Sequence, residues 1–320
     1  MMAWYWIVLT CIAGILLLYF LFCLVISSLF PKTTMIPKGS RHPSFEQVRK
    51  DQLSRGHANF DAYDKMDKEP FIINGDGADI VGEFIPAQRA LQPGERPKCV
   101  IRVHGHGQNR LISVRYIKAF MDMGYSAVIY DQRAFGDSTG KFCTLGYKEK
   151  YDLSAIISHV KKRLGENAII GVHGESLGAI TIMEALGIDK RIDFAVVDGG
   201  CTTFREASVN KMKHVIHLRS SLMMYMINRS LKKKYGFNFA DVEPIKRVAE
   251  SDVPILFIHG TEDKEFPVSM CKDLRKASKN PLSSMEIFEG VGHCQCHALY
   301  TERYEKAITQ FVCSVEATLS

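Results

Sequence analysis

Short apolar runs alternate with helical patterns from about residue 70 onward, and this alternation restricts the possible folds more than any other feature of the chain. The strand-like runs are 71–74, 80–86, 99–104, 126–130, 168–173, 194–197, 254–259 and 285–288. The helical patterns are 111–123, 148–164, 177–186, 270–278 and 298–315. Strands that are apolar along their whole length are buried on both faces, so we expect an α/β fold with a parallel sheet and helices on both sides.

The N-terminal segment is apolar enough to cross a membrane. Between Ala3 and Ile26 there are 24 residues without a charge or a proline, which as a helix can span roughly 30 Å of hydrocarbon. The alternative is a cleaved signal peptide, which requires a positively charged start and a small-residue cleavage site. No Lys or Arg precedes the segment, and Val25-Ile26-Ser27-Ser28 is a poor cleavage site. We therefore expect one uncleaved transmembrane helix and localisation to the cell membrane.

Charge indicates which side of the membrane holds the rest of the chain. Basic residues follow the apolar segment but do not precede it: Lys32, Lys38, Arg41, Arg49, Lys50 and Arg55. Positive flanks remain in the cytoplasm, so we expect the C-terminal domain to be cytoplasmic. Nine cysteines without a repeated spacing also fit a reducing compartment. The net charge of +6 is too small to indicate a nucleic-acid partner.

The expected domains are a membrane anchor at 1–30, a linker with a short helix at 31–69, and a globular domain at 70–320. Within the last, more than fifty residues between the runs at 194–197 and 254–259 contain no strand, which predicts a small helical insertion at about 201–245. The insertion contains a methionine-rich stretch, 222–227, and several basic residues, including Lys232-Lys233-Lys234. These charges are consistent with a solvated surface, with binding of anionic lipid headgroups, or with an acidic substrate.

A candidate nucleophile follows the strand-like run at 168–173. The sequence Gly174-Glu175-Ser176-Leu177-Gly178 has the pattern G-x-S-x-G and leads into a helical stretch. In this strand–turn–helix context, the flanking glycines permit a sharp turn, and the serine lies at a helix N-terminus that favours a developing negative charge. We predict Ser176 as the nucleophile. The alternative is a tight turn with an inert serine.

A serine hydroxyl needs a base, and the base needs an acid to orient it. Asp263 lies just beyond the run at 254–259, and His293 follows the last run. The carboxyl ends of parallel strands form one edge of a sheet, so these side chains are expected near Ser176. The order Ser176, Asp263, His293 is the order typical of this architecture. Asp198 and Glu262 remain alternative acids.

The tetrahedral intermediate needs two hydrogen-bond donors. One candidate is the backbone N–H of Leu177, the residue after the nucleophile. The other is expected from the loop after Val100–Val103, which is His104-Gly105-His106-Gly107-Gln108-Asn109, with the N–H of His106 favoured and Gly107 as the alternative. No metal site is predicted: the histidines of this loop and of the stretch 293–297 do not have a standard zinc spacing. No nucleotide-binding pattern is present, so no cofactor is expected.

The chain resembles the α/β-hydrolase superfamily and is most similar to bacterial serine hydrolases of the S9/S33-like group, some of which have an N-terminal membrane anchor. Four blocks support the resemblance: His104-Gly105-His106-Gly107, the stretch 131–138 with Gly140, the serine turn, and His259-Gly260 with Asp263 followed by Gly292-His293. The resemblance implies an eight-stranded sheet, a cap after strand six and an acyl-enzyme. Ala134 replaces a usual glycine and Phe266 a common valine.

These observations predict a membrane-anchored serine hydrolase that acts on small-molecule or lipid acyl esters without a cofactor. A peptidase of the same fold is the second enzymatic possibility. A non-catalytic binding protein, or an adaptor that works at the membrane surface through its basic segment, is the alternative outside enzymes. The oligomeric state and the substrate are not specified by any pattern in the sequence.

Overall fold

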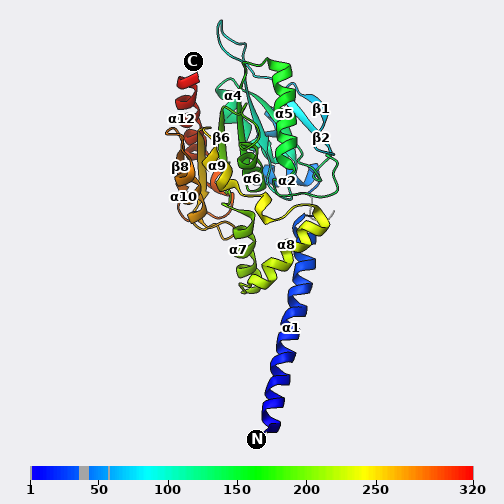
Figure 1. Ribbon diagram of the computed structural model, residues 1–320. Helices are drawn as coiled ribbons and strands as arrows, with labels where there is room; N and C mark the ends of the chain where they lie inside the picture. The colour runs from blue at the N-terminus through cyan, green and yellow to red at the C-terminus, as the bar shows by residue number, and fades with distance from the viewer. Residues whose placement is uncertain (1, 36–42, 57, 320) are drawn as a thin grey trace.

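A computed structural model describes residues 2–35, 43–56 and 58–319, and its centre is a mixed β-sheet (Figure 1). In the described residues the sheet has eight strands in the order β1-β2-β4-β3-β5-β6-β7-β8. The strands are β1 (Glu69–Asn74), β2 (Asp79–Ile85), β3 (Lys98–Val103), β4 (Ser126–Tyr130), β5 (Ile169–Glu175), β6 (Phe194–Asp198), β7 (Ile255–Gly260) and β8 (Ser284–Phe288). β1 and β2 are antiparallel to their neighbours, and the other pairs are parallel. The expected mostly parallel sheet is confirmed.

Helices cover both faces of the sheet, because alternate residues of each buried strand point to opposite sides. Val100 packs with the helices on one face, while Ile101 packs with those on the other. The first face is covered by α2 (Phe45–Ser54), α3 (Phe60–Lys65), α4 (Val114–Asp122) and α12 (Thr301–Leu319). The second face is covered by α5 (Glu149–Leu164), α6 (Leu177–Ala185), α9 (Pro244–Glu250) and α10 (Val268–Ala277).

The predicted insertion after strand six is a pair of helices that lie outside the two covered faces. α7 (Phe204–Ile216) and α8 (Ser221–Tyr235) are below the sheet in Figure 1, and a short turn of 3₁₀ helix, η3 (Phe239–Asp241), leads back to α9. Thr203 and Ser220 cap the N-termini of the two helices through their side-chain oxygens. His217, which ends α7, has φ +53, and this left-handed residue reverses the chain between them.

The N-terminal helix α1 (Met2–Met35) projects away from the sheet, with its N-terminus at the far end (Figure 1). Of the described helices, it alone is long and apolar enough to cross a membrane, with a mean hydropathy of 2.8. Its last turns are different: Cys23, Phe30 and Met35 are buried in a hydrophobic cluster with α7, α8 and the start of α6. α1 therefore has an exposed outer part and a buried inner end.

The helix extends beyond the range expected from the sequence, because it continues through Pro31 to Met35. A proline inside a helix removes one backbone N–H and usually ends or bends it. Here the following turn is retained by tertiary contacts, including a hydrogen bond of 2.8 Å from the N–H of Cys143 to the carbonyl of Met35. The short helix expected at 44–55 is α2. Its start, Ser44 with Gln47 three residues later, is a capping box. Residues 36–42 of the expected linker lie outside the described residues.

Candidate active site

Ser176 lies in the sharp turn between β5 and α6, at the carboxyl edge of the sheet. Its backbone has φ +51 and ψ −115, a conformation that a residue with a side chain rarely adopts. The backbone N–H of Ser176 donates to the carbonyl of Asp198 on the neighbouring strand at 2.8 Å, which holds the turn against β6. Strained conformations of this kind occur at functional sites, where the surrounding structure enforces them. The turn presents the Ser176 hydroxyl outward from the strand end.

Two glycines make this turn possible because the backbone passes very close to its neighbours. A Cβ on Gly178 would lie 2.0 Å from the carbonyl oxygen of Val103 at the end of β3. A Cβ on Gly174 would lie 2.6 Å from the carbonyl carbon of Gly178. No side chain fits at either position without moving backbone. The G-x-S-x-G pattern is therefore a steric requirement of the contact between α6 and β3.

The three side chains predicted from the sequence form one chain of hydrogen bonds. The Nε2 of His293 is 2.9 Å from the Ser176 hydroxyl, and its Nδ1 is 2.7 Å from Oδ2 of Asp263. Nδ1–H donates to the carboxylate, which leaves Nε2 as the acceptor for the serine proton. The geometry is that of a nucleophile beside a base that is oriented by an acid.

Asp263 is held as a buried carboxylate by several donors. Its Oδ1 accepts the backbone N–H groups of Glu265 and Phe266, both at 2.9 Å, and its Oδ2 lies 3.2 Å from Nε2 of His259. Burial alone would raise the pKa of Asp263, but the hydrogen bonds from His259 and His293 lower it well below its ordinary value. The carboxylate is therefore ionised at neutral pH.

The pKa of His293 is shifted in the opposite direction. Burial would lower it, but the hydrogen bond and the negative charge of Asp263 raise it above its ordinary value. The ring of Phe266 packs edge-on against the ring of His293, with centroids 5.1 Å apart. Phe266 thus fixes the ring orientation of His293 and also donates its backbone N–H to Asp263. It occupies the position where the similar bacterial hydrolases commonly have a valine.

The two alternative acids are placed differently. Asp198 is buried at the end of β6, and burial together with the charge of Glu175 raises its pKa to about 7. Its raised pKa makes Asp198 a weaker partner for a histidinium than Asp263, which is ionised. Glu262 is exposed, and its backbone N–H donates to the carbonyl of Val291. The structure therefore brings Asp263, and neither alternative, to Nδ1 of His293.

The loop after β3 lies against the serine turn. A Cβ on Gly105 would be 3.7 Å from the Cβ of Ser176, so the backbone of this loop directly faces Ser176. His106 and Leu177 line the same cavity as Ser176. As the first residue of α6, Leu177 has an N–H with no acceptor inside the helix. Gly107, the alternative donor, has φ +73 and is not among the described residues that line the cavity.

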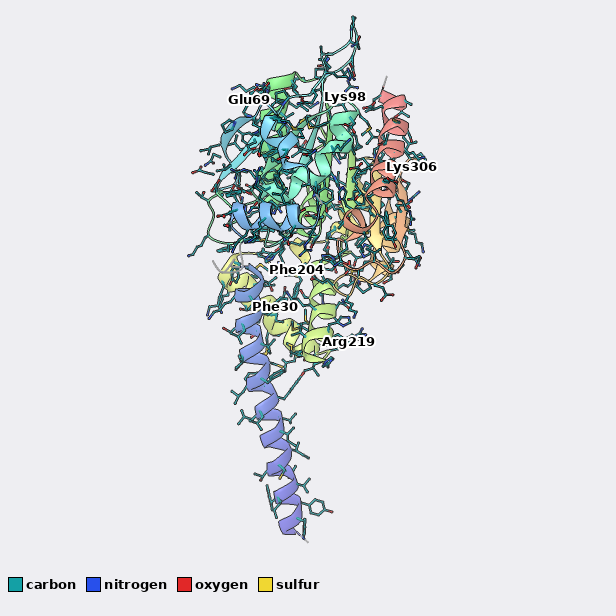
Figure 2. The ribbon with its side chains drawn as sticks, turned by 180° about the vertical axis from the view of Figure 1, so that it is seen from behind. Phe30, Glu69, Lys98, Phe204, Arg219 and Lys306 are labelled. Carbon is teal, nitrogen blue, oxygen red and sulfur yellow. The ribbon has the colours of Figure 1, made fainter. Side chains whose placement is uncertain are left out.

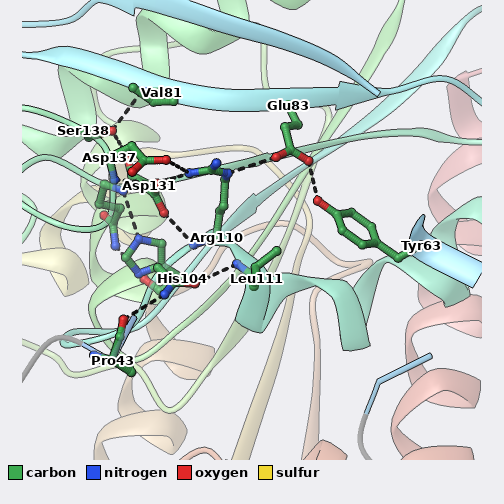
Figure 3. Close-up of polar contacts among 12 residues, drawn as sticks. Pro43, Tyr63, Val81, Glu83, His104, Arg110, Leu111, Asp131, Asp137 and Ser138 are labelled. Atoms are coloured by element: carbon green, nitrogen blue, oxygen red, sulfur yellow. Dashed lines mark hydrogen bonds and ion pairs between the residues drawn. The ribbon is translucent and has the colours of Figure 1, made fainter. Parts of the chain in front are cut away.

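Polar contacts with other parts of the chain fix the position of the loop after β3 (Figure 3). Nε2 of His104 accepts the backbone N–H of Gln132 at 2.9 Å, and its Nδ1–H donates to the carbonyl of Gly105 at 2.7 Å. These two bonds define one neutral tautomer, and burial lowers the pKa of His104 to about 4, so the ring stays neutral at physiological pH. At the far end of the loop, the Asn109 amide donates to the carbonyl of Pro43 at 3.0 Å.

Arg110 links the end of the loop to two other parts of the fold (Figure 3). Its side chain pairs with Glu83 of β2 and with Asp131 after β4, and its backbone N–H donates to Asp131 at 2.6 Å. Asp131 begins the stretch 131–138 that was singled out in the sequence. Within that stretch Ala134 has φ +63, the left-handed conformation that explains why glycine is usual there.

A cavity of about 720 Å³ opens beside Ser176. Six apolar residues of its lining belong to one hydrophobic cluster and form its apolar part: Phe30, Leu145, Leu177, Ile180, Phe204 and Ala207. The lining also includes polar residues, among them Asp51, Gln52, Arg55, Gln108, Arg115 and Glu175. Sequence reasoning missed the lining residues from α1 and α2, because no local pattern marks them. Within 2–35, 43–56 and 58–319, no group of three His, Cys, Asp or Glu side chains is arranged to hold a metal ion.

Comparisons with known proteins place this arrangement among hydrolases. A family model described as "Serine aminopeptidase, S33" matches residues 94–236. The uncharacterized protein YqkD of Bacillus subtilis is 29% identical over 270 residues, which cover 83% of this chain and 86% of YqkD. The lysophosphatidylserine lipase ABHD12 of Xenopus tropicalis is 24% identical over 187 residues, which cover 55% of this chain and 45% of that protein.

A solved structure supports the same fold. The esterase Pf2001 of Pyrococcus furiosus superposes with a TM-score of 0.63 and 23% sequence identity, and the match covers 78% of this chain and 93% of the esterase. At this level of identity the likeness establishes the fold alone. The sheet order, the serine turn and the three hydrogen-bonded side chains described above are independent of it.

Proposed function

The chain belongs to the α/β-hydrolase superfamily, and from this premise we propose that it is a membrane-anchored serine hydrolase that cleaves carboxylic esters of apolar acyl groups. The observation that supports the proposal most is the hydrogen-bonded series Ser176–His293–Asp263 at the mouth of a cavity with an apolar part. Asp263 is ionised, as the role of the acid requires, and Nε2 of His293 faces the Ser176 hydroxyl.

The proposed reaction begins with attack of the Ser176 oxygen on the ester carbonyl. His293 takes the serine proton at Nε2 and then gives it to the leaving alcohol, which produces an acyl-enzyme. Water, activated in turn by His293, cleaves the acyl-enzyme and releases the acid. The backbone N–H groups of Leu177 and His106 stabilise the oxyanion of each tetrahedral intermediate. This assignment is based on the position of Leu177 at the start of α6 and of His106 in the loop after β3.

The substrate preference follows from the lining of the cavity and from α1. The apolar part of the cavity suits an acyl chain, and a helix able to span a bilayer keeps the enzyme where such chains are concentrated. Two of the similar proteins are an esterase and a lysophosphatidylserine lipase, which agrees with an acyl ester as the substrate.

A fluorophosphonate probe tests the proposal, because it labels only a serine that a neighbouring base activates. The full-length protein in detergent should be labelled, and Ser176→Ala should abolish labelling. Ser314→Ala is the matched control: Ser314 is an exposed serine on α12, and its loss should leave labelling intact. Absence of labelling in a folded wild-type protein would contradict the proposal.

A serine peptidase is the second candidate, and the family model description is the observation that favours it. An aminopeptidase needs a free carboxylate near the nucleophile to bind the substrate ammonium. Of the three carboxylates among the described residues that line the cavity, Asp51 is paired with Arg55 at 2.9 Å and Glu175 with Arg102 at 3.4 Å, while the exposed Glu265 lies 3.9 Å from Nε2 of His293. Glu265 is therefore the carboxylate that a peptidase could use. Because the cavity also has a large apolar lining, we expect p-nitrophenyl esters to be hydrolysed faster than aminoacyl p-nitroanilides. The reverse preference would favour the peptidase.

We also propose that the catalytic domain is cytoplasmic, from the basic residues that follow the apolar segment. Cys313 on α12 is exposed and offers a direct test. A membrane-impermeant maleimide should label Cys313 only after cells are permeabilised, and Cys313→Ser supplies the background. Labelling of intact cells at this residue would place the domain outside.

A further inference from the structure

The inner end of α1 lines the cavity that contains Ser176. Phe30 is only 5% exposed, in contrast to Phe22 two turns earlier on the same helix, which is 41% exposed. Phe30 and Thr34 both line the cavity. Phe30 also belongs to the same hydrophobic cluster as Leu177, the residue that follows Ser176. The helix that leads out of the domain therefore also contributes side chains to the candidate active site.

The opposite wall of the apolar part is α7. Phe204 and Ala207 on its first turns line the cavity, and Val215 near its end lines it as well while remaining 65% exposed. Between them the wall is partly polar, with Ser208, Lys211 and His214, and the Lys211 ammonium lies 5.8 Å from the centre of the Phe30 ring. The cavity thus extends from Ser176 along α7 to an open end near Val215. Figure 2 shows Phe30 and Phe204 on the same side of the sheet, where α1 joins the rest of the molecule.

A second contact ties α1 to the predicted oxyanion loop. Nε2 of His106 lies 2.9 Å from the backbone carbonyl of Thr34 in the last turn of α1. Burial lowers the pKa of His106, so the ring is neutral and its Nε2–H donates to this carbonyl. The His106 ring also packs edge-on against Phe135, with centroids 5.3 Å apart. The position of His106, and hence of its backbone N–H, depends on the position of α1.

The open end of the cavity lies on the side where α1 leaves the domain. The turn between α7 and α8 contacts α1 at Tyr19, whose hydroxyl bonds that of Ser220. Fifteen residues separate Trp4 from Tyr19, which is about 22 Å of helix and less than the roughly 30 Å of a hydrocarbon core. If α1 spans a bilayer with Trp4 at the far surface, this turn therefore enters the near leaflet, and Arg219 at its tip (Figure 2) must extend toward the headgroups.

We infer that the last turns of α1 and the facing side of α7 form the binding site for the acyl chain of the substrate, which enters from the bilayer at the end of α7. The inference rests on the proposed function and adds to it the place where the chain binds. In this arrangement α1 determines specificity: Phe30 contacts the acyl chain, and Thr34 positions the loop that contains His106.

The test is the dependence of kcat/KM on acyl chain length for a series of p-nitrophenyl esters, measured on the full-length protein in detergent. Phe30→Ala removes part of the wall and should reduce the ratio of kcat/KM for a long-chain ester over the acetate ester by about tenfold. Phe30→Trp adds volume and should shift the preferred chain to a shorter length. Ala207→Trp, on the facing wall, should shift it in the same direction as Phe30→Trp.

Phe22→Ala and Phe22→Trp are the matched controls, because Phe22 is the same residue type on the same helix but faces outward. Both should keep the chain-length profile of the wild type. Equal profiles for the Phe30 variants, the Phe22 variants and the wild type would overturn the inference, since α1 would then be only a tether.

Fluorophosphonate labelling of each variant separates the two possible failures. Variants that are labelled at Ser176 but have an unchanged chain-length profile contradict the acyl-site inference and leave the serine hydrolase proposal in place. Failure of the folded wild type to be labelled contradicts the proposed function itself. A Phe30 variant that does not fold is replaced by Phe30→Leu, for which a smaller change in the same direction as Phe30→Ala is expected.

Discussion

The two sides of the cavity are built in different ways. On the sheet side, Ser176, Asp263 and His293 are held by short polar contacts and by glycines that permit no side chain. On the other side, α1, α7 and α8 contact each other mainly through Met, Phe and Leu side chains, with an exposed basic surface outside. Directed hydrogen bonds fix atoms to within fractions of an ångström, whereas apolar packing tolerates replacement. From this comparison we propose that the sheet side controls the rate and that the helical side controls the choice of substrate.

The largest effect should come from the acid on the sheet side. Asp263→Asn keeps the size of the side chain but removes the charge that orients and stabilises His293, and we expect kcat to fall by about 10⁴-fold. Asp198→Asn is the matched control, because Asp198 is also buried at a strand end nearby. It should change kcat by less than about tenfold. A larger effect of Asp198→Asn than of Asp263→Asn would reverse the assignment of the acid.

A glycine of the serine turn should give the next largest effect. Gly178→Ala places a Cβ where only 2.0 Å separates it from the carbonyl oxygen of Val103, so α6 must move and Ser176 with it. A displacement of about 1 Å at a reacting group can reduce the rate roughly 10²-fold. Gly14→Ala, where a Cβ meets nothing within 4 Å, should leave esterase kinetics unchanged. If Gly178→Ala has the same kcat as the wild type, the serine turn tolerates a shift of its backbone. That result would contradict the contrast between the sheet side and the apolar side of the cavity.

The pH dependence of the reaction should report the contact between His293 and Asp263. His293 acts as a base only when neutral, and its pKa is raised, so kcat/KM should increase with pH with a midpoint above the ordinary histidine value of about 6.5. Below that midpoint the rate should fall about tenfold per pH unit. Asp263→Asn removes the group that raises this pKa, so the residual activity should have a midpoint at lower pH. An unchanged midpoint in that variant would mean that Asp263 does not control the base.

The smallest effect should come from the basic surface of the cap. Replacing Lys232, Lys233 and Lys234 with Gln removes three exposed positive charges at the end of α8, beside α1. Each charge near an anionic bilayer contributes about 1 kcal/mol to binding, before screening by salt. We expect a severalfold loss of activity on substrate in anionic vesicles and little change in neutral detergent. Complete loss of function with unchanged Ser176 labelling would favour the adaptor hypothesis.

The difference between the two sides of the cavity also explains which features could be predicted from the sequence. The strands, the helices between them and the order Ser176, Asp263, His293 follow from local patterns, because buried strands and tight turns restrict the residues at each position. The structure joins these three side chains by hydrogen bonds, while their catalytic roles stay predictions. The contacts of Phe30 and Thr34 could not be predicted, since packing between distant helices leaves no periodic signal, and Pro31 suggested an earlier helix end. The link from His259 to Asp263 likewise appears only when the strand and its following loop are placed in space.

If α1 spans a membrane as we propose, the position of Phe30 and Thr34 beyond its exposed part makes the candidate active site sensitive to the thickness of the bilayer. An apolar helix that is too long for the surrounding lipid tilts, and one that is too short draws the bilayer thinner around it. Because Pro31 lies between these two residues and weakens the backbone hydrogen bonding there, tilt of the outer helix would be absorbed close to the cavity. We expect turnover in reconstituted membranes to vary with the acyl length of the host lipid, so that the physical state of the bilayer itself acts as a regulator of the enzyme.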